Sequence, residues 1–292
     1  MTKHIEIYEV GPRDGLQNEK ALIPSDDKIR LVNLLSDVGF KQIEVTSFVS
    51  PKWVPQMADA DVVMAGINRR DDISYAVLTP NMRGFEAALN AKASEVAIFG
   101  AASEGFSQKN INCSIAESLG RFTPVMQAAR EAGLPVRGYI SCVIACPYDG
   151  TTDPEVVLDV GEKLLEMGCY ELSLGDTIGA GTPDDIQRLL ETMTKTIPPH
   201  LIAGHFHDTS GRALTNVDAA IAFDVLRFDT AAGGLGGCPY APGAKGNLST
   251  MALAQHLHSK GYETGLDMEK LSKAEIFLTS LNISEKTTQE AL

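Results

Sequence analysis

The chain has 292 residues, of which 25 are lysine or arginine and 38 are aspartate or glutamate, so its formal net charge is −13 at pH 7. This acidic balance argues against nucleic-acid binding, because phosphate contacts need clustered lysine and arginine. The length suits one α/β barrel and is enough to bury a large core without disulfide staples.

Three features of the sequence bear on where the protein works. No apolar run approaches the roughly 20 residues that span a bilayer, so no membrane attachment is expected. The first predicted strand begins at Ile5, which leaves no room for a transit peptide. The odd number of cysteines favours free thiols in a reducing compartment; they are Cys113, Cys142, Cys146, Cys169 and Cys238. We therefore expect a cytoplasmic protein.

Strand-like and helix-like segments alternate along the whole chain. Apolar, β-branched runs predict eight strands, at residues 5–10, 42–46, 74–78, 95–99, 136–143, 170–174, 201–207 and 226–230. Helical spacing of apolar residues is clearest at 28–38, 115–132, 154–167 and 184–193. This alternation favours a parallel sheet, and eight strands are the number that closes a (β/α)8 barrel. A doubly wound open sheet is the lesser alternative.

No linker or low-complexity tract divides the chain. The expected fold is therefore α/β, a (β/α)8 TIM barrel with additional C-terminal helices. We expect one domain over residues 1–292, with the barrel at about 4–265 and a helical extension at about 266–292. Catalytic groups of such barrels lie at the C-terminal ends of the strands and in the loops that follow.

The segment Gly204–Asp208 carries two histidines at the end of the seventh predicted strand. Side chains alternate along a strand, so His205 and His207 share one face, about 7 Å apart, and Phe206 points to the other. Two imidazoles on one face can bind one cation. A structural or solvated pair is the simpler alternative.

The ends of the first two strands add charged groups. Asp14 lies where a third metal ligand would come from, and Arg13 could face an anionic or enolate oxygen, although the two could also form a plain salt bridge. Alternation places Glu44 and Thr46 on one face of the second strand. If that face is the barrel interior, Glu44 needs a partner such as Arg13.

The later strands end in further candidates. Asp176 could cap the turn that follows it, or orient a ligand and exchange protons. For Asp208, directly after the histidines, we expect a structural role. The glycine-rich segment 231–247 lacks the spacing of a nucleotide P-loop and suits a closing loop, on which Cys238 could exchange a proton. Asn247 could offer its carbonyl oxygen to a metal or cap the last helix.

Two nitrogens and two oxygens, from His205, His207, Asp14 and Asn247, form a mixed ligand set. It would leave room for two oxygens of a chelating substrate around an octahedral ion. Mg²⁺ or Mn²⁺ therefore fits better than structural zinc, which prefers four closed ligands.

Several separated segments closely resemble the 3-hydroxy-3-methylglutaryl-CoA lyase family within the DRE-TIM metallolyases. The match extends from about Ile5 to Gly265. It rests on segments 11–19 (GPRDGLQNE), 46–57 (TSFVSPKWVPQM), 99–104 (FGAASE), 109–114 (KNINCS), 173–179 (SLGDTIG) and 234–241 (GLGGCPYA).

The resemblance implies a metal-dependent retro-Claisen cleavage of 3-hydroxy-3-methylglutaryl-CoA into acetyl-CoA and acetoacetate. It implies that Mg²⁺ or Mn²⁺ is bound by Asp14, His205, His207 and Asn247. It further implies that Arg13 stabilises the thioester enolate, that Arg13 and Gln17 bind the substrate, and that Cys238 takes part in proton transfer. Asp176 and Glu44 match acidic positions that support proton transfer and site geometry. A homodimer is the family expectation, and Lys109, Asn110 and Asn112 are plausible coenzyme A contacts.

The sequence departs from the family pattern at three places. Residues 230–233 read Thr-Ala-Ala-Gly before the glycine loop, Phe206 stands where the family often has cysteine, and the segment 247–252 lacks acidic residues. Because Phe206 should point out of the barrel, we expect it to affect packing rather than chemistry.

Four other functions are alternatives to this hypothesis. A lyase for a longer 3-hydroxy-3-alkylglutaryl-CoA is the nearest, and a condensing member of the superfamily is disfavoured by the Cys238 loop. A 2-His-1-carboxylate iron oxygenase could use Asp14 with the same histidines but would consume oxygen. A non-catalytic metabolite-binding protein would bind the thioester without turnover.

Overall fold

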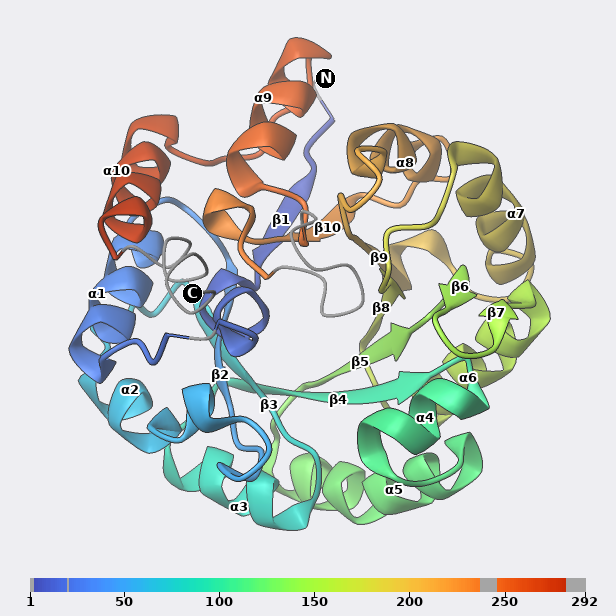
Figure 1. Ribbon diagram of the computed structural model, residues 1–292, viewed down its shortest axis with the longest axis horizontal. Coiled ribbons are helices and arrows are strands. Elements are labelled where there is room, and N and C mark those ends of the chain that lie inside the picture. The colour runs from blue at the N-terminus through green and yellow to red at the C-terminus, as the bar shows by residue number, and fades with distance from the viewer. Residues whose placement is uncertain (1–2, 20, 237–245, 282–292) are drawn as a thin grey trace, which may run out of the picture.

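The computed structural model describes residues 3–19, 21–236 and 246–281. Eight parallel strands close into a barrel in the order β1-β10-β9-β8-β5-β4-β3-β2 (Figure 1). The strands are β1 Glu6–Glu9, β2 Gln42–Ser47, β3 Ser74–Leu78, β4 Glu95–Ala101, β5 Val136–Ser141, β8 Glu171–Asp176, β9 Ile202–Phe206 and β10 Arg227–Thr230. The expected (β/α)8 fold is confirmed.

Helices surround the barrel (Figure 1). They are α1 Ser25–Ser36, α2 Ala60–Gly66, α3 Met82–Asn90, α4 Glu104–Ile111, α5 Ile115–Ala132, α6 Pro154–Met167, α7 Pro183–Met193, α8 Ala213–Ile221, α9 Thr250–Ser259 and α10 Met268–Ser280, with short turns η1 Gly11–Gly15, η2 Pro55–Met57, η3 Pro199–Leu201 and η4 Ala232–Gly234. None of the helices in the described part of the chain has the length and apolar character to cross a membrane.

Local sequence explains where several helices begin. Ser114 and Glu117 form reciprocal side-chain and backbone hydrogen bonds at the start of α5, and Thr182 and Asp185 do the same at α7. Pro154 occupies the first position of α6, where its missing N–H costs nothing.

The predicted strands agree with the observed ones to within two residues at each end. One prediction about β2 is wrong, because the register shifts between Glu44 and Thr46. The Thr46 hydroxyl contacts the sulfur of Met57 at 3.4 Å, whereas Glu44 pairs with Arg13. A β-bulge adds a residue and breaks simple alternation. The small antiparallel pair β6 Ala145–Cys146 and β7 Gly150–Thr151 was not predicted.

The core has two parts of opposite character. Apolar residues fill the layer between strands and helices, and Phe206 lies there against the Phe228 ring at 6.3 Å, as its outward orientation predicts. The barrel interior instead contains buried charged and aromatic side chains, among them Arg137, Asp229 and Tyr8. This polar interior lies beneath the site.

Helix α10 lies beyond the predicted barrel boundary and packs against α1 and η4. Its buried face includes Leu271 and Ala274, and the Asp267 amide before it donates to the Val38 carbonyl at 2.8 Å. The division of the chain at about residue 265 stays a prediction, and residues 282–292 lie outside the described part.

Candidate metal centre and active site

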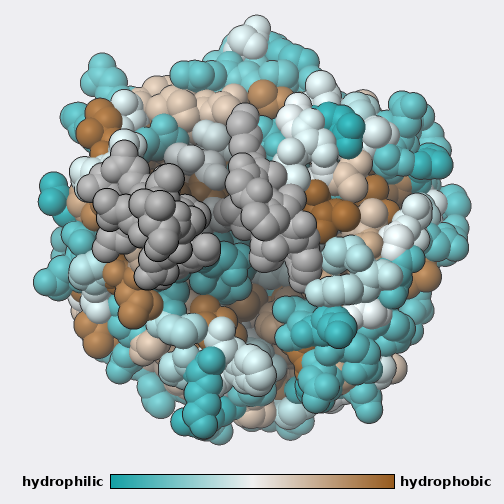
Figure 2. All heavy atoms as spheres, viewed as in Figure 1, coloured by the Kyte–Doolittle hydropathy of each residue, from teal (hydrophilic) through white to brown (hydrophobic). Residues whose placement is uncertain are grey.

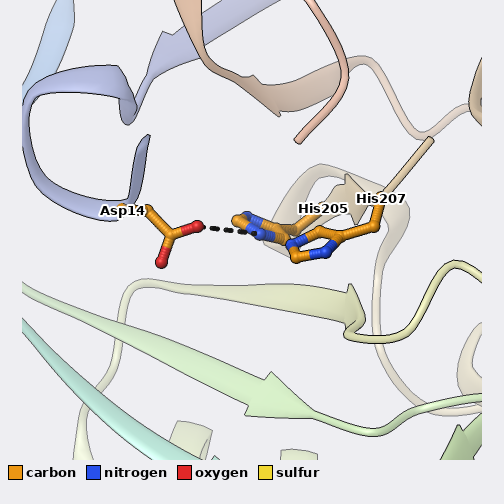
Figure 3. A group of neighbouring side chains, drawn as sticks. All are labelled: Asp14, His205 and His207. Atoms are coloured by element: carbon orange, nitrogen blue, oxygen red, sulfur yellow. Dashed lines mark ion pairs between the residues drawn. The ribbon is translucent and has the colours of Figure 1, made fainter. Parts of the chain in front are cut away.

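Asp14, His205 and His207 meet at the C-terminal ends of the strands (Figure 3). Asp14 lies on η1 directly after β1, His205 lies in β9, and His207 follows that strand. One ligand atom from each residue lies within 4.8 Å of the other two, and Nε2 of His205 is 3.8 Å from Oδ2 of Asp14. The strand order brings these residues close together, because only β10 lies between β1 and β9 in the closed barrel.

Asn247 joins this cluster from the chain before α9. Its amide nitrogen donates to Oδ2 of Asp14 at 2.8 Å and to the Leu235 carbonyl at 3.1 Å. The backbones of His207 and Asn247 form an antiparallel bridge. The structure therefore brings all four predicted ligand residues together. The cap of α9 is Ser249, not Asn247.

Arg13 is buried between two carboxylates. Its Nε donates to Oε2 of Glu44 at 2.6 Å, and its NH1 donates to Oδ1 of Asp14. Burial disfavours its charge, but the negative charges of Glu44 and Asp14 outweigh burial and raise the pKa of Arg13. The predicted contact between Glu44 and Arg13 is confirmed, and Arg13 stays cationic at every accessible pH.

Several polar residues beneath the cluster were not among the sequence candidates. Oδ2 of Asp229 lies 3.0 Å from Nδ1 of His205, and Arg137 donates to both oxygens of Asp229. The Tyr139 hydroxyl donates to Oε2 of Glu44 at 3.1 Å. The sequence did contain a signal for Arg137 and Asp229, because both are charged residues inside predicted strands. A charged side chain that is buried in a strand must be paired with another charged or polar group.

The charges shift the pKa values of the three clustered side chains in different directions. Burial would raise the pKa of Asp14, but Arg13 and the two histidines lower it to about 2. Burial and the neighbouring His205 lower the pKa of His207 to about 4. Burial opposes protonation of His205, yet the Asp229 carboxylate raises its pKa. At neutral pH the cluster offers an ionised carboxylate and a neutral His207, both in the state that a metal needs.

A pocket of about 830 Å³ opens over the cluster. Figure 2 shows the hollow on this face of the molecule, bordered by hydrophilic and hydrophobic side chains. Its walls include predicted metal ligands, predicted substrate-binding residues, predicted coenzyme A contacts and residues that were not predicted. They include Arg13, Asp14, Gln17, His205, His207, Lys109, Asn110, Asn112, Tyr139 and Ser173. Gln17 and the predicted coenzyme A contacts therefore lie in one pocket with the cluster.

The remaining candidates lie elsewhere. Asp176 is buried, and its oxygens accept from the Ala180 and Gly181 amides at 3.1 and 2.9 Å. It organises the turn after β8 and is not among the described residues that line the pocket, so its part in proton transfer stays a prediction. Asp208 accepts from the Ala213 amide at the start of α8, in agreement with a structural role. Cys238 lies outside the described residues.

The protein has a closed (β/α)8 barrel with one carboxylate and two imidazoles at its strand ends. It therefore belongs to the class of TIM barrels with a candidate divalent-metal site. Within this class the chain belongs to the HMGL-like family, whose model matches residues 4–278.

Named relatives are similar over nearly the whole chain. A cytoplasmic 3-hydroxy-3-methylglutaryl-CoA lyase of Mus musculus is 53% identical over 278 residues, which cover 95% of this chain and 81% of that protein. The crystal structure of the HMG-CoA lyase from Brucella melitensis is 55% identical, with a TM-score of 0.95 over 96% of this chain and 99% of that one. An Acinetobacter baumannii HMG-CoA lyase in complex with coenzyme A and 3-methylmalate is 37% identical, with a TM-score of 0.91 over 95% and 91% of the chains.

Proposed function

We propose that this protein is a carbon–carbon lyase that cleaves 3-hydroxy-3-methylglutaryl-CoA into acetyl-CoA and acetoacetate. The observation that carries the proposal is the convergence of Asp14, His205, His207 and Asn247 beside Arg13 in one large pocket. The relatives described above are named for the methyl-substituted substrate, which favours it over a longer 3-alkyl chain.

The donor set fits a divalent ion. Nδ1 of His207 is buried without a hydrogen-bond partner, a cost that a nearby ligand or cation removes. The Asn247 nitrogen is engaged by Asp14 and Leu235, so the oxygen is the atom of this amide that a cation would take. Asp14, His205, His207 and Asn247 would thus hold Mg²⁺ or Mn²⁺. Bound there, the ion supplies Lewis acidity toward substrate oxygens.

The protein residues divide the remaining work. The C3 hydroxyl of the substrate gives its proton to a base and becomes the ketone of acetoacetate, while the C2–C3 bond breaks and its electron pair passes into the thioester as an enolate. The enolate takes up a proton at C2, so no proton is gained or lost overall. Arg13 lines the pocket and keeps its charge, so it can stabilise that enolate oxygen. Cys238 is proposed to exchange the proton that converts the enolate to acetyl-CoA. Asp176 and Glu44 are proposed to support proton transfer and geometry.

Substrate recognition is proposed to use the pocket walls. Gln17 lines the same pocket as Arg13, and so do Lys109 and Asn110, along which an acyl-CoA chain could extend. The A. baumannii relative was solved with coenzyme A bound, which supports an acyl-CoA ligand here. Lysine and amide groups are suited to the phosphate and amide oxygens of coenzyme A.

An anaerobic assay tests the proposed reaction. Enzyme, 3-hydroxy-3-methylglutaryl-CoA and Mg²⁺ are expected to yield acetoacetate and acetyl-CoA in equal amounts without oxygen, and removal of the ion with a chelator is expected to abolish turnover. An oxygen requirement would instead indicate the iron oxygenase. Binding without product would indicate a metabolite-binding protein.

Two variants separate the proposed proton transfer from metal binding. Cys238→Ser is expected to lower kcat by about 100-fold or more while the bound metal per chain is unchanged. His207→Ala is expected to lower metal affinity as well, because it removes one of the ligands. Turnover measured beside metal content checks both, and unchanged turnover in Cys238→Ser would remove the thiol from the mechanism.

A cytoplasmic location and a homodimer are part of the proposal. The mouse relative's name includes the cytoplasm. Cell fractionation and sedimentation velocity check the two statements; a single species of 31.3 kDa would exclude the dimer.

A further inference from the structure

Each nitrogen of the His205 ring faces a carboxylate. Nδ1 lies 3.0 Å from Oδ2 of Asp229, and Nε2 lies 3.8 Å from Oδ2 of Asp14. A neutral imidazole carries its proton on only one nitrogen, and only the other can bind a metal. The contact made by Nδ1 therefore decides whether Nε2 is available.

Asp229 is fixed by three donors other than the histidine. NH2 of Arg137 donates to Oδ1 at 2.7 Å, NH1 of Arg137 donates to Oδ2 at 2.9 Å, and the Ser173 hydroxyl donates to Oδ2 at 2.7 Å. Asp229 is 2% exposed and Arg137 is 0% exposed. A bidentate arginine pair of this kind sets both the charge and the plane of the carboxylate.

Arg137 is itself immobilised in the barrel interior. Its Nε donates to Oε1 of Glu171 at 2.7 Å, and its guanidinium lies over the Tyr8 ring at 4.1 Å from the centroid. Its NH1 also donates to the Tyr139 hydroxyl at 3.2 Å, and that hydroxyl donates to Glu44, the partner of Arg13. The arginine thus connects through side-chain contacts to both the His205 side and the Asp14 side of the site.

We propose that Asp229, clamped by Arg137, is a positioning residue that keeps the His205 proton on Nδ1 and directs the Nε2 lone pair toward Asp14 and the metal. The carboxylate oxygen can only accept, so Nδ1 must donate to it. Carboxylate partners of this type fix the tautomer and orientation of metal-binding histidines. The assignment rests on the proposed metal function, but its first consequence is measurable without any metal.

The tautomer of His205 can be read in the metal-free protein. Two-bond ¹H–¹⁵N correlation spectra of ¹⁵N-histidine-labelled protein at pH 8 separate the two neutral tautomers, and loss of a signal in His205→Gln assigns the ring. The expected result is a protonated Nδ1 and an unprotonated Nε2. A protonated Nε2 would overturn the proposal.

Asp229→Asn tests the consequence for metal binding. Asparagine has no negative charge, and either orientation of its amide sets the NH2 group against a donor: NH2 of Arg137 at the Oδ1 position, or NH1 of Arg137 and the Ser173 hydroxyl at the Oδ2 position. The variant therefore breaks the clamp and weakens the contact that holds the proton on Nδ1 of His205. Mn²⁺ affinity, measured by electron paramagnetic resonance of the free ion, is expected to fall 10- to 100-fold.

Glu171→Gln is the matched control. It removes the charge of the other carboxylate that binds Arg137 and leaves Asp229 intact. It is expected to lower the melting temperature while Mn²⁺ affinity stays within about threefold of wild type. Equal losses of affinity in both variants would overturn the proposal in favour of general destabilisation.

If Asp229→Asn does not fold, the wild-type spectrum alone decides the assignment. A wild-type protein that binds no Mn²⁺ but shows the predicted tautomer would refute the metal function instead.

Discussion

Arg13 is held by two carboxylates of different roles. Glu44 binds its Nε from inside the barrel, and Asp14 binds its NH1 from the metal cluster. The guanidinium also lies over the Tyr139 ring, 5.4 Å from the centroid. A planar fork can satisfy these three neighbours at once, whereas a lysine ammonium cannot. At the scale of single residues, the position of the cation is therefore set by shape as well as charge.

Arg13→Lys is expected to lower kcat by about 100-fold or more and to change KM less, because the fixed donor to the developing enolate is lost. Steady-state kinetics with the thioester substrate measure both constants. Arg30→Lys is the control, since Arg30 is an exposed arginine on α1 that stacks on Phe277. Arg13→Lys with the kcat of that control would contradict the role of the guanidinium.

At the scale of elements, Glu9 of β1 joins the turn that carries Asp14 to η4 and to the start of α9. Its Oε1 accepts from the amides of Gly11 and Ala232 at 2.8 and 2.9 Å, and its Oε2 accepts from the Thr250 hydroxyl at 2.7 Å. A Cβ at residue 11 would lie 2.5 Å from Oε1 of Glu9, so the turn that carries Asp14 needs glycine there. Burial raises the pKa of Glu9 to about 7, because its hydrogen bonds only partly offset lost hydration.

This raised pKa makes stability depend on pH. Glu9 contributes stability that is fully present below its unfolded value of 4.5 and is lost as pH rises through about 7. The lost contribution is on the order of 3 kcal/mol at high pH. Urea unfolding of wild type and Glu9→Gln between pH 5 and pH 8 checks this. As pH rises, the free energy of unfolding of the wild type should fall relative to that of Glu9→Gln. A constant difference between the two proteins would contradict the raised pKa of Glu9.

The elements were largely predictable from the sequence, and the buried contacts between them were not. The strands could be predicted because a run of apolar residues in the sequence is enough to indicate a buried strand. For example, β3 was predicted at its observed bounds. The bulge after Glu44 depends on pairing with β3, which the β2 sequence alone does not specify. The contact of Asp229 with His205 depends on the register between β9 and β10, since the residues are 24 positions apart on adjacent strands. The position of Asn247 before the last helix allowed a metal ligand or a helix cap, and the family resemblance favoured the ligand.

At the scale of the whole molecule, α10 completes the layer of helices around the barrel. It packs on α1 and on η4, a turn within the glycine-rich segment, and Oε1 of Glu275 accepts from the Gly233 amide at 2.9 Å. Leu271 on its inner face is 0% exposed, and Ile276 on its outer face is 66% exposed. Burial of this kind predicts that the helix stabilises the barrel as part of one cooperative unit.

Leu271→Ala is expected to lower the free energy of unfolding by about 2–4 kcal/mol, because it leaves a cavity in a packed layer. Ile276→Ala on the same helix is the control, with an expected change within about 0.5 kcal/mol. Urea unfolding of both variants measures this. Equal small effects, or a separate transition for the C-terminal part, would show that α10 is an independent appendage.

Anomalous X-ray diffraction at the manganese edge, from crystals grown with Mn²⁺, tests whether the four proposed ligand residues bind one divalent ion. We expect one anomalous peak per chain within about 2.0–2.4 Å of ligand atoms from Asp14, His205, His207 and Asn247. A peak at another place in the protein, or no peak under conditions in which the enzyme turns over, would contradict it.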